Sequence, residues 1–154
     1  MHSQQDTSVF FIDDSDTDNF IHQQFFHRYC KNYNYTFFNS AIHALDYIKI
    51  VLANDNLFQD KVPEYIFLDL DLPIKSGFEF LDEFEPLNER INHKIKVVIL
   101  TASFNPADKA KSSTYKSVVK FILKPFTKSS LSGFGLRLKS QEELIINDHV
   151  VKNK

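Results

Sequence analysis

Short apolar runs alternate with longer amphipathic stretches along almost the whole chain. Four of the runs are nearly continuous in apolar residues, as expected of strands that are buried on both faces. These four runs predict strands at 8–12, 64–69, 95–101 and 118–123, and a more polar segment predicts another strand at 35–38. The intervening stretches have helical spacing and predict helices at 16–31, 40–54, 77–85, 106–113 and 128–144.

Regular alternation of strand and helix favours a parallel sheet covered by helices on both faces, in a doubly wound (βα)5 arrangement. The helix starts carry suitable capping residues, Ser15 or Asp16 before the first and Asn105 before the fourth. The last helix has the weakest pattern, because Gly133 and Gly135 inside it each cost up to about 1 kcal/mol relative to Ala.

Length and composition favour one domain of 154 residues, with a core at about 8–145 and flexible tails at 1–7 and 147–154. A net charge of -2 argues against nucleic acid as a partner. The single cysteine, Cys30, excludes an internal disulfide and fits a reducing cytoplasm. Apolar runs are all shorter than the roughly 20 residues needed to span a bilayer, so we expect no membrane insertion.

Charged and hydroxyl residues follow the predicted strands at the edge where open α/β sheets build their sites. Asp13 and Asp14 follow the first strand, Asp69 ends the third, Thr101 ends the fourth and Lys124 follows the fifth. Carboxylates gathered at one edge repel each other unless a cation lies among them, and Mg²⁺ prefers oxygen ligands. Since Mg²⁺ takes only one or two carboxylates, Asp14 and Asp69 can bind it directly and Asp13 through a water.

The same residues suit the chemistry of a phosphoryl group. A carboxylate such as Asp69 can act as a nucleophile and form an acyl phosphate. The ammonium of Lys124 can pair with a phosphoryl oxygen, and the hydroxyl of Thr101 can donate a hydrogen bond to another. The pocket can therefore bind a metal ion and a phosphoryl group together.

In this order the residues resemble the receiver domains of two-component response regulators, the CheY-like family. The resemblance runs from about Val9 to about Leu144, and the motifs that carry it are Asp13–Asp14, Asp69–Pro73 with Gly77, Thr101–Ala102 and Lys124–Pro125. It implies a flavodoxin-like three-layer sandwich with strand order 2-1-3-4-5. It also implies a signalling domain that phosphorylates and dephosphorylates itself rather than an enzyme with a separate substrate.

The resemblance implies that Asp69 is phosphorylated from a phosphohistidine on a histidine kinase or a phosphotransfer protein. It implies Mg²⁺ as cofactor, bound by Asp14, Asp69 and the backbone carbonyl of Asp71, with Asp13 assisting. Thr101 and Lys124 would then bind the phosphoryl oxygens. The family also implies a cis peptide bond between Lys124 and the proline that follows it.

Phe121 falls at the aromatic position that moves inward with Thr101 when receivers switch. Asp71 and Ser103 occupy the two positions that tune the lifetime of the phosphate in the family. Because the chain ends soon after the fifth predicted helix, we expect output by contact with a downstream protein or by a phosphorelay. The expected output face is formed by the fourth helix, fifth strand and fifth helix.

Two other functions fit part of the pattern. A haloacid-dehalogenase-like phosphatase also uses an Asp-x-Asp pair, a Thr and a Lys, which Asp69, Asp71, Thr101 and Lys124 can match. However, Pro73 stands where that family usually has Thr or Val, and the Asp13–Asp14 pair would have no role. A degenerate receiver that binds a partner without phosphorylation is the other alternative, which the intact set of residues opposes.

Overall fold

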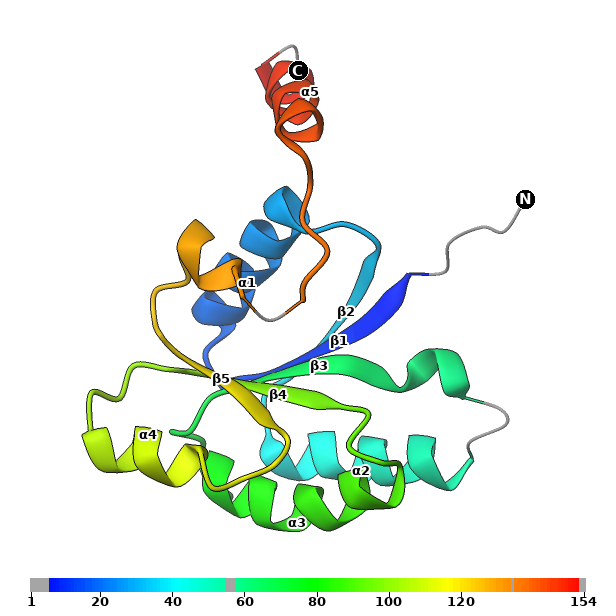
Figure 1. Cartoon of the computed structure of the whole chain (residues 1–154), viewed down its shortest axis with the longest axis vertical. Coiled ribbons are helices and arrows are strands. Elements are labelled where there is room, and N and C mark those ends of the chain that lie inside the picture. The colour runs from blue at the N-terminus through cyan, green and yellow to red at the C-terminus, as the bar shows by residue number, and fades with distance from the viewer. Residues whose placement is uncertain (1–5, 55–57, 134, 153–154) are drawn as a thin grey trace.

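The computed structural model of the chain describes residues 6–54, 58–133 and 135–152. Its centre is a five-stranded parallel sheet in the order β2-β1-β3-β4-β5 (Figure 1). The strands are β1 (Thr7–Ile12), β2 (Tyr33–Phe38), β3 (Pro63–Leu68), β4 (Lys96–Thr101) and β5 (Val118–Leu123). The predicted doubly wound fold and its strand order are confirmed.

Helices cover both faces of this sheet, with α2, α3 and α4 on one side and α1 on the other (Figure 1). Their bounds are α1 (Asp16–Tyr29), α2 (Ala41–Ala53), α3 (Gly77–Arg90), α4 (Pro106–Ser112) and α5 (Gln141–Lys152), with 3-10 turns η1 (Gln59–Lys61) and η2 (Lys128–Leu131). Ser15 caps α1 and Asn105 caps α4 through their side-chain oxygens, which confirms both predicted starts. Helix α3 is longer than predicted and continues through Pro86.

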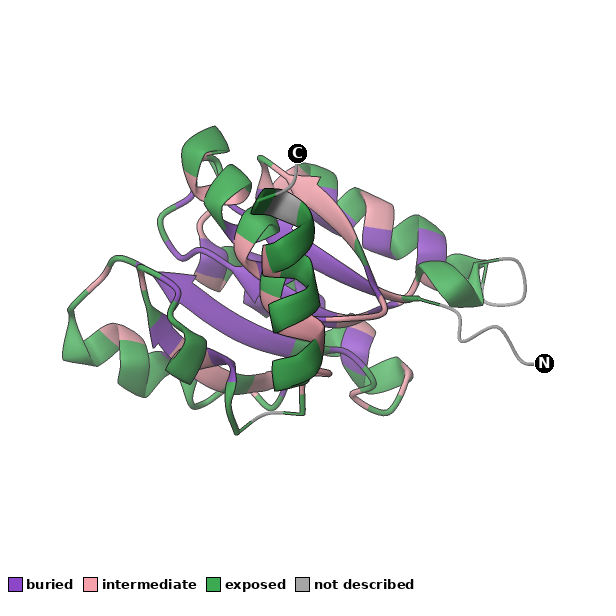
Figure 2. Ribbon diagram, turned by 90° about the horizontal axis from the view of Figure 1, so that it is seen from above, coloured by how far each residue is buried: buried purple, intermediate pink, exposed green. Residues whose placement is uncertain are grey.

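The sheet separates two hydrophobic cores, and its buried strands lie between helices whose outer faces are exposed (Figure 2). On the α2–α3 side, fully buried Phe80 and Phe84 stack with ring centroids 5.4 Å apart. On the α1 side, the rings of Phe11 and Phe26 each lie 4.9 Å from that of Phe67. Aromatic side chains from strands and helices therefore fill the two layers that hold the sheet edge in place.

The C-terminal region differs from the helix predicted at 128–144. Among the described residues of this stretch, a short 3-10 turn, η2, forms at the start, and α5 begins at Gln141. Gly133 and Gly135 have φ angles of 90° and 89°, in the left-handed region that an α-helix does not contain. The two glycines therefore interrupt the predicted helix. Before them, the side chain of Leu131 is buried in the core on the α1 side.

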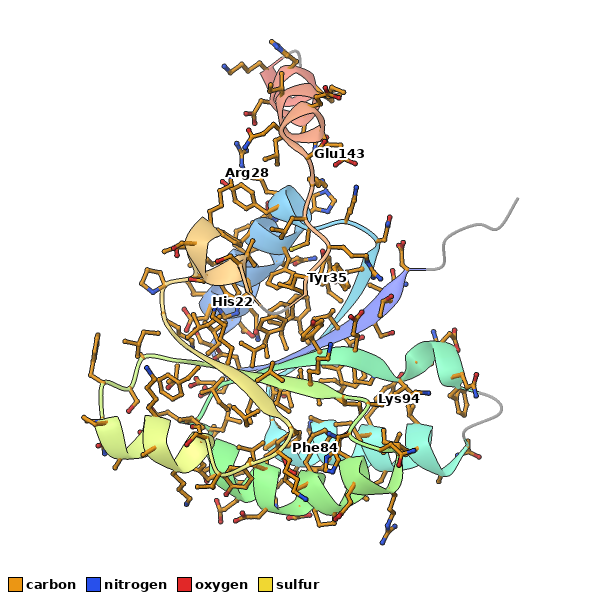
Figure 3. All side chains as sticks on the ribbon, viewed as in Figure 1. His22, Arg28, Tyr35, Phe84, Lys94 and Glu143 are labelled. Atoms are coloured by element: carbon orange, nitrogen blue, oxygen red, sulfur yellow. The ribbon has the colours of Figure 1, made fainter. Side chains whose placement is uncertain are left out.

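Helix α5 projects beyond the end of α1 and away from the sheet (Figure 1). Ion pairs join Arg28 to Asp148 at 2.9 Å and Lys31 to Glu143 at 3.3 Å, and Arg28 and Glu143 mark this junction in Figure 3. Residues 147–152, expected to belong to a flexible tail, are helical. The fifth helix was expected to share an output face with the fourth helix and fifth strand, but α5 does not lie beside α4 (Figure 1).

Within the described ranges, no helix is both long enough and apolar enough to cross a membrane.

Candidate functional site

The carboxyl ends of four strands meet at one edge of the sheet. The backbone N–H of Asp69, just after β3, donates to the carbonyl of Ile12 at the end of β1 (2.9 Å). The N–H of Lys124, just after β5, donates in the same way to the carbonyl of Thr101 at the end of β4 (2.9 Å). Parallel pairing thus brings residues that are far apart in sequence to one place.

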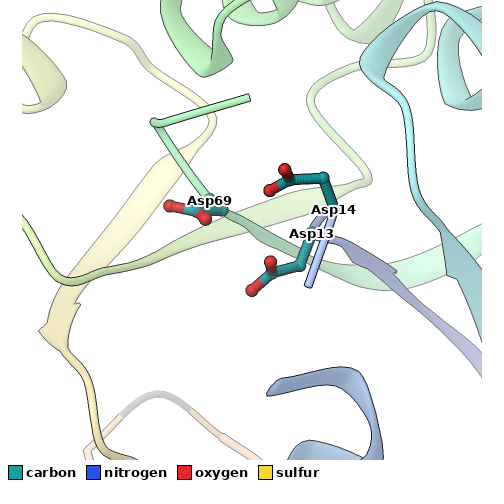
Figure 4. A group of neighbouring side chains, drawn as sticks. All are labelled: Asp13, Asp14 and Asp69. Atoms are coloured by element: carbon teal, nitrogen blue, oxygen red, sulfur yellow. The ribbon is translucent and has the colours of Figure 1, made fainter. Parts of the chain in front are cut away.

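Three carboxylates form an acidic cluster at this edge, with Asp13 and Asp14 leaving β1 and Asp69 leaving β3 (Figure 4). One oxygen from each lies within 4.8 Å of the others. Asp13 and Asp69 are 3% and 7% exposed, whereas Asp14 is exposed to solvent. This set of oxygen donors, with an open side for water ligands, fits Mg²⁺, which usually keeps several waters.

Lys124 lies against this cluster. Its Nζ is 2.6 Å from Oδ2 of Asp13, 2.7 Å from Oδ2 of Asp18 and 3.3 Å from Oδ2 of Asp69. Burial by itself lowers the pKa of Lys124, but the hydrogen bonds to Asp13 and Asp18 and the charge of Asp69 raise it above its ordinary value. The side chain is therefore a permanent cation facing the acidic cluster.

The electrostatics of Asp69 reflect its position in the pocket. Burial raises the pKa of its carboxyl group, the Lys124 ammonium opposes this change, and the charge of Asp13 adds to it. Its Oδ1 also accepts a hydrogen bond of 3.3 Å from the backbone N–H of Asp71. The poorly hydrated Asp69 carboxylate thus has one oxygen directed to a cation and one to a backbone donor.

The remaining predicted residues surround this centre. Thr101 is fully buried, and its Oγ1 accepts from the N–H of Ser103 at 3.2 Å. The hydroxyl of Ser103 donates to Asp108 of α4 at 2.5 Å. Asp71 is exposed beside the cluster, and half-buried Phe121 packs against the core on the α2–α3 side. The predicted cis bond between Lys124 and its following proline is confirmed.

Sequence reasoning missed the third carboxylate at Lys124, which belongs to Asp18. The spacing of Ser15 and Asp18 is typical of a helix start, and the N–H of Asp18 indeed donates to the Ser15 hydroxyl at 3.2 Å. The pattern explains the backbone N–H of Asp18 as part of the helix cap, but it does not predict the ion pair between the Asp18 side chain and Lys124. The side-chain amide of Asn19 also stabilises the site, since it donates to the backbone carbonyl of Asp13 at 2.8 Å.

His22 lies one turn after Asp18 and is 4% exposed (Figure 3). Its ring stacks on Phe11 at 5.6 Å between centroids, so the side chain is part of the packing on the α1 side. Burial lowers the pKa of His22 to about 4 despite the opposing charge of Asp13. The imidazole is therefore neutral near pH 7 and adds no charge to the pocket.

The fold and the pocket together define a doubly wound α/β domain with an acidic site at the point where strand order reverses. Comparison with known proteins identifies the family more closely. The model of the response regulator receiver domain matches residues 9–133, so the chain belongs to this family. The acidic cluster of Asp13, Asp14 and Asp69 fits the phosphorylation site of these signalling domains, and the receiver resemblance is confirmed.

Solved structures show the same fold. A two-component response regulator from Cytophaga hutchinsonii is 22% identical, with a TM-score of 0.69 and coverage of 97% of this chain and 99% of that one. A response regulator receiver protein from Dyadobacter fermentans is 22% identical, with a TM-score of 0.66 and coverage of 81% and 91%. The Mn²⁺-bound response regulator Rcp1 is 25% identical, with a TM-score of 0.63 and coverage of 81% and 86%. No curated protein matches the chain.

Receiver domains bind Mg²⁺ at an acidic site and are phosphorylated by histidine kinases or phosphotransfer proteins. Both properties agree with the cluster observed here. The family and the pocket do not favour the phosphatase or the degenerate receiver as alternatives.

Proposed function

We propose that Asp69 accepts a phosphoryl group from a phosphohistidine of a histidine kinase or phosphotransfer protein. An Asp69 oxygen attacks phosphorus, the phosphorus–nitrogen bond of the partner breaks, and the imidazole nitrogen keeps the electron pair. The product is an acyl phosphate, which water hydrolyses to restore the carboxylate. The observation that carries this proposal is the contact of Lys124 with both Asp13 and Asp69.

The other residues of the pocket receive roles from their positions. Lys124 pairs with a phosphoryl oxygen, for which its permanent charge and its closeness to Asp69 suit it. The hydroxyl of Thr101 donates to a second phosphoryl oxygen, and the exposed Asp71 and the hydroxyl of Ser103 affect the lifetime of the phosphate. Phe121 moves with Thr101 as part of the switch.

Asp13, Asp14, Asp69 and the backbone carbonyl of Asp71 are the proposed ligands of Mg²⁺, with Asp13 acting through a water. Mg²⁺ would supply positive charge that offsets the charge of the transferred phosphoryl group. The response regulator Rcp1, which is 25% identical, has a Mn²⁺-bound form, and this supports a divalent cation as a ligand of the present chain.

A histidine-bearing partner would dock on α1 beside the acidic cluster, where Phe20 is 61% exposed next to Asn19. Downstream output would use the surface of α4 and β5, where Val119 and Leu123 are 45% and 40% exposed. The proposed location is the cytoplasm, and the free, buried thiol of Cys30 is compatible with its reducing conditions.

The direct test is incubation with acetyl phosphate and Mg²⁺ followed by phosphate-affinity gel electrophoresis. The wild-type protein should give a shifted band that disappears with EDTA, and Asp69→Asn should give none. A modified Asp69→Asn protein would show that another residue accepts the phosphoryl group. Sustained turnover of a simple phosphate ester that is lost in Asp71→Asn would instead indicate a phosphatase.

A further inference from the structure

Lys124 has one carboxylate partner that belongs to α1 rather than to the acidic cluster. Its Nζ lies 2.7 Å from Asp18, closer than the 3.3 Å that separates it from Asp69. An ammonium has three N–H donors, and Asp13, Asp18 and Asp69 provide one acceptor each. Asp18 therefore competes for the donors that a phosphoryl group on Asp69 needs.

The first turn of α1 fixes the position of Asp18. The Ser15 hydroxyl accepts from the backbone N–H of Asp18, and the N–H of Ser15 in turn donates to the Asp13 carboxylate at 3.0 Å. Asn19 ties the same turn to the backbone of Asp13. The Asp18 side chain is about one third exposed, at 35%, so its charge is only partly screened by water.

The charges of the pocket show what Asp18 adds. Three carboxylates of the acidic cluster and the ammonium of Lys124 leave two negative charges, which one divalent cation would balance. His22, neutral near pH 7, does not change this balance. The carboxylate of Asp18 leaves the pocket with one further negative charge.

We propose that Asp18 is a positioning residue that holds the Lys124 ammonium on the α1 side of the pocket. Its added charge strengthens binding of the divalent cation and weakens binding of a phosphoryl group at Asp69. This inference rests on the proposed phosphorylation of Asp69. In it, Asp18 sets the relative affinity of the site for the divalent cation and for the phosphoryl group.

The test compares Asp18→Asn with Asp16→Asn, which removes an equal charge from the same helical turn. Asp16 is exposed and is not among the carboxylates that Lys124 contacts in the described chain. Mg²⁺ binding alone is measured by calorimetry. Beryllofluoride, a phosphoryl analogue, is then titrated at saturating Mg²⁺ while the Thr101 amide resonance is followed by NMR.

For Asp18→Asn we expect Mg²⁺ affinity to fall and beryllofluoride affinity to rise, each by about three- to tenfold, since a neighbouring charge in contact shifts an ionic equilibrium by tenfold or more before solvent screening. Asp16→Asn should change both affinities by less than about twofold, because exposed charges are screened. Asp18→Glu restores the charge and should return both affinities toward wild type.

If Asp18 had a purely structural role, its substitution would lower the affinities for Mg²⁺ and for beryllofluoride together. Shifts of the two affinities in opposite directions therefore identify the effect of its charge. Shifts in the same direction, or shifts equal to those of Asp16→Asn, would overturn the proposal. Asp18→Ser is a second uncharged variant that keeps the backbone donor to Ser15, and it must show the same opposite shifts. Wild-type protein that does not bind beryllofluoride would reject the proposed function itself, whereas wild-type binding with an unaffected Asp18→Asn would reject only the role of Asp18.

Discussion

Gly77 lies where the start of α3 touches the loop that carries Asp69. A Cβ atom at this position would lie 2.6 Å from the backbone oxygen of Asp69 and 2.8 Å from Cα of Leu70. The N–H of Gly77 also donates to the carbonyl of Leu70 at 3.0 Å, which holds the two segments together. Glycine is required here because a side chain has no space between the helix and the loop.

The size of the effect of Gly77→Ala follows from these distances. Real Cβ contacts essentially never fall below 3.0 Å, so the helix or the Asp69 loop must move by at least 0.4 Å. Overpacking of this kind lowers the free energy of unfolding by about 1–3 kcal/mol. For a chain of this length that corresponds to a drop in Tm of about 2–12 °C. Phosphorylation should slow as well, because the attacking carboxylate moves with its loop.

Thermal and urea unfolding measure the first effect, and the rate of acetyl phosphate labelling measures the second. The double variant Gly77→Ala with Leu70→Ala is the control. Compared with Leu70→Ala alone, it should show the same loss of stability that Gly77→Ala shows compared with wild type, because the two shortest contacts involve backbone atoms. A Gly77→Ala protein with wild-type stability and labelling rate would refute the close-approach argument.

Three further predictions concern other parts of the molecule. Asn88 is fully buried, and its side chain makes two hydrogen bonds with the backbone of Ile95. Asn88→Ala should therefore lower the free energy of unfolding, measured by urea denaturation, by about 2–4 kcal/mol. An unchanged midpoint of the urea transition would contradict this prediction. Burial lowers the pKa of His22 to about 4 from 6.5, so between these pH values the unfolded chain binds more protons than the folded chain. The free energy of unfolding should therefore fall by up to about 3 kcal/mol as the pH drops from 6.5 to about 4. The His22→Phe variant should show a smaller fall over this pH range, and an equal fall would contradict the prediction. Asp14→Asn should reduce the rise in Tm that Mg²⁺ causes, whereas Asp16→Asn should not, and equal rises would exclude Asp14 as a ligand.

Much of the fold follows from local patterns in the sequence. Continuous apolar runs mark the strands, and the capping residues Ser15 and Asn105 mark helix starts, because these signals depend on neighbouring residues only. The end of the chain was harder to predict, since its helical spacing competed with Gly133 and Gly135. The left-handed backbone at these glycines fits a break in the helix because Leu131 before them packs in the core and α5 after them forms an ion pair with α1.

The sequence by itself determined that Asp13, Asp14, Asp69, Thr101 and Lys124 share one edge of the sheet, because parallel strands all end on the same side. Only the tertiary structure decided how their side chains share charge. The ion pair between Asp18 and Lys124 joins residues 106 positions apart and depends on how α1 packs against the sheet. No local periodicity records such a contact, because side-chain distances across a fold arise from the packing of whole elements.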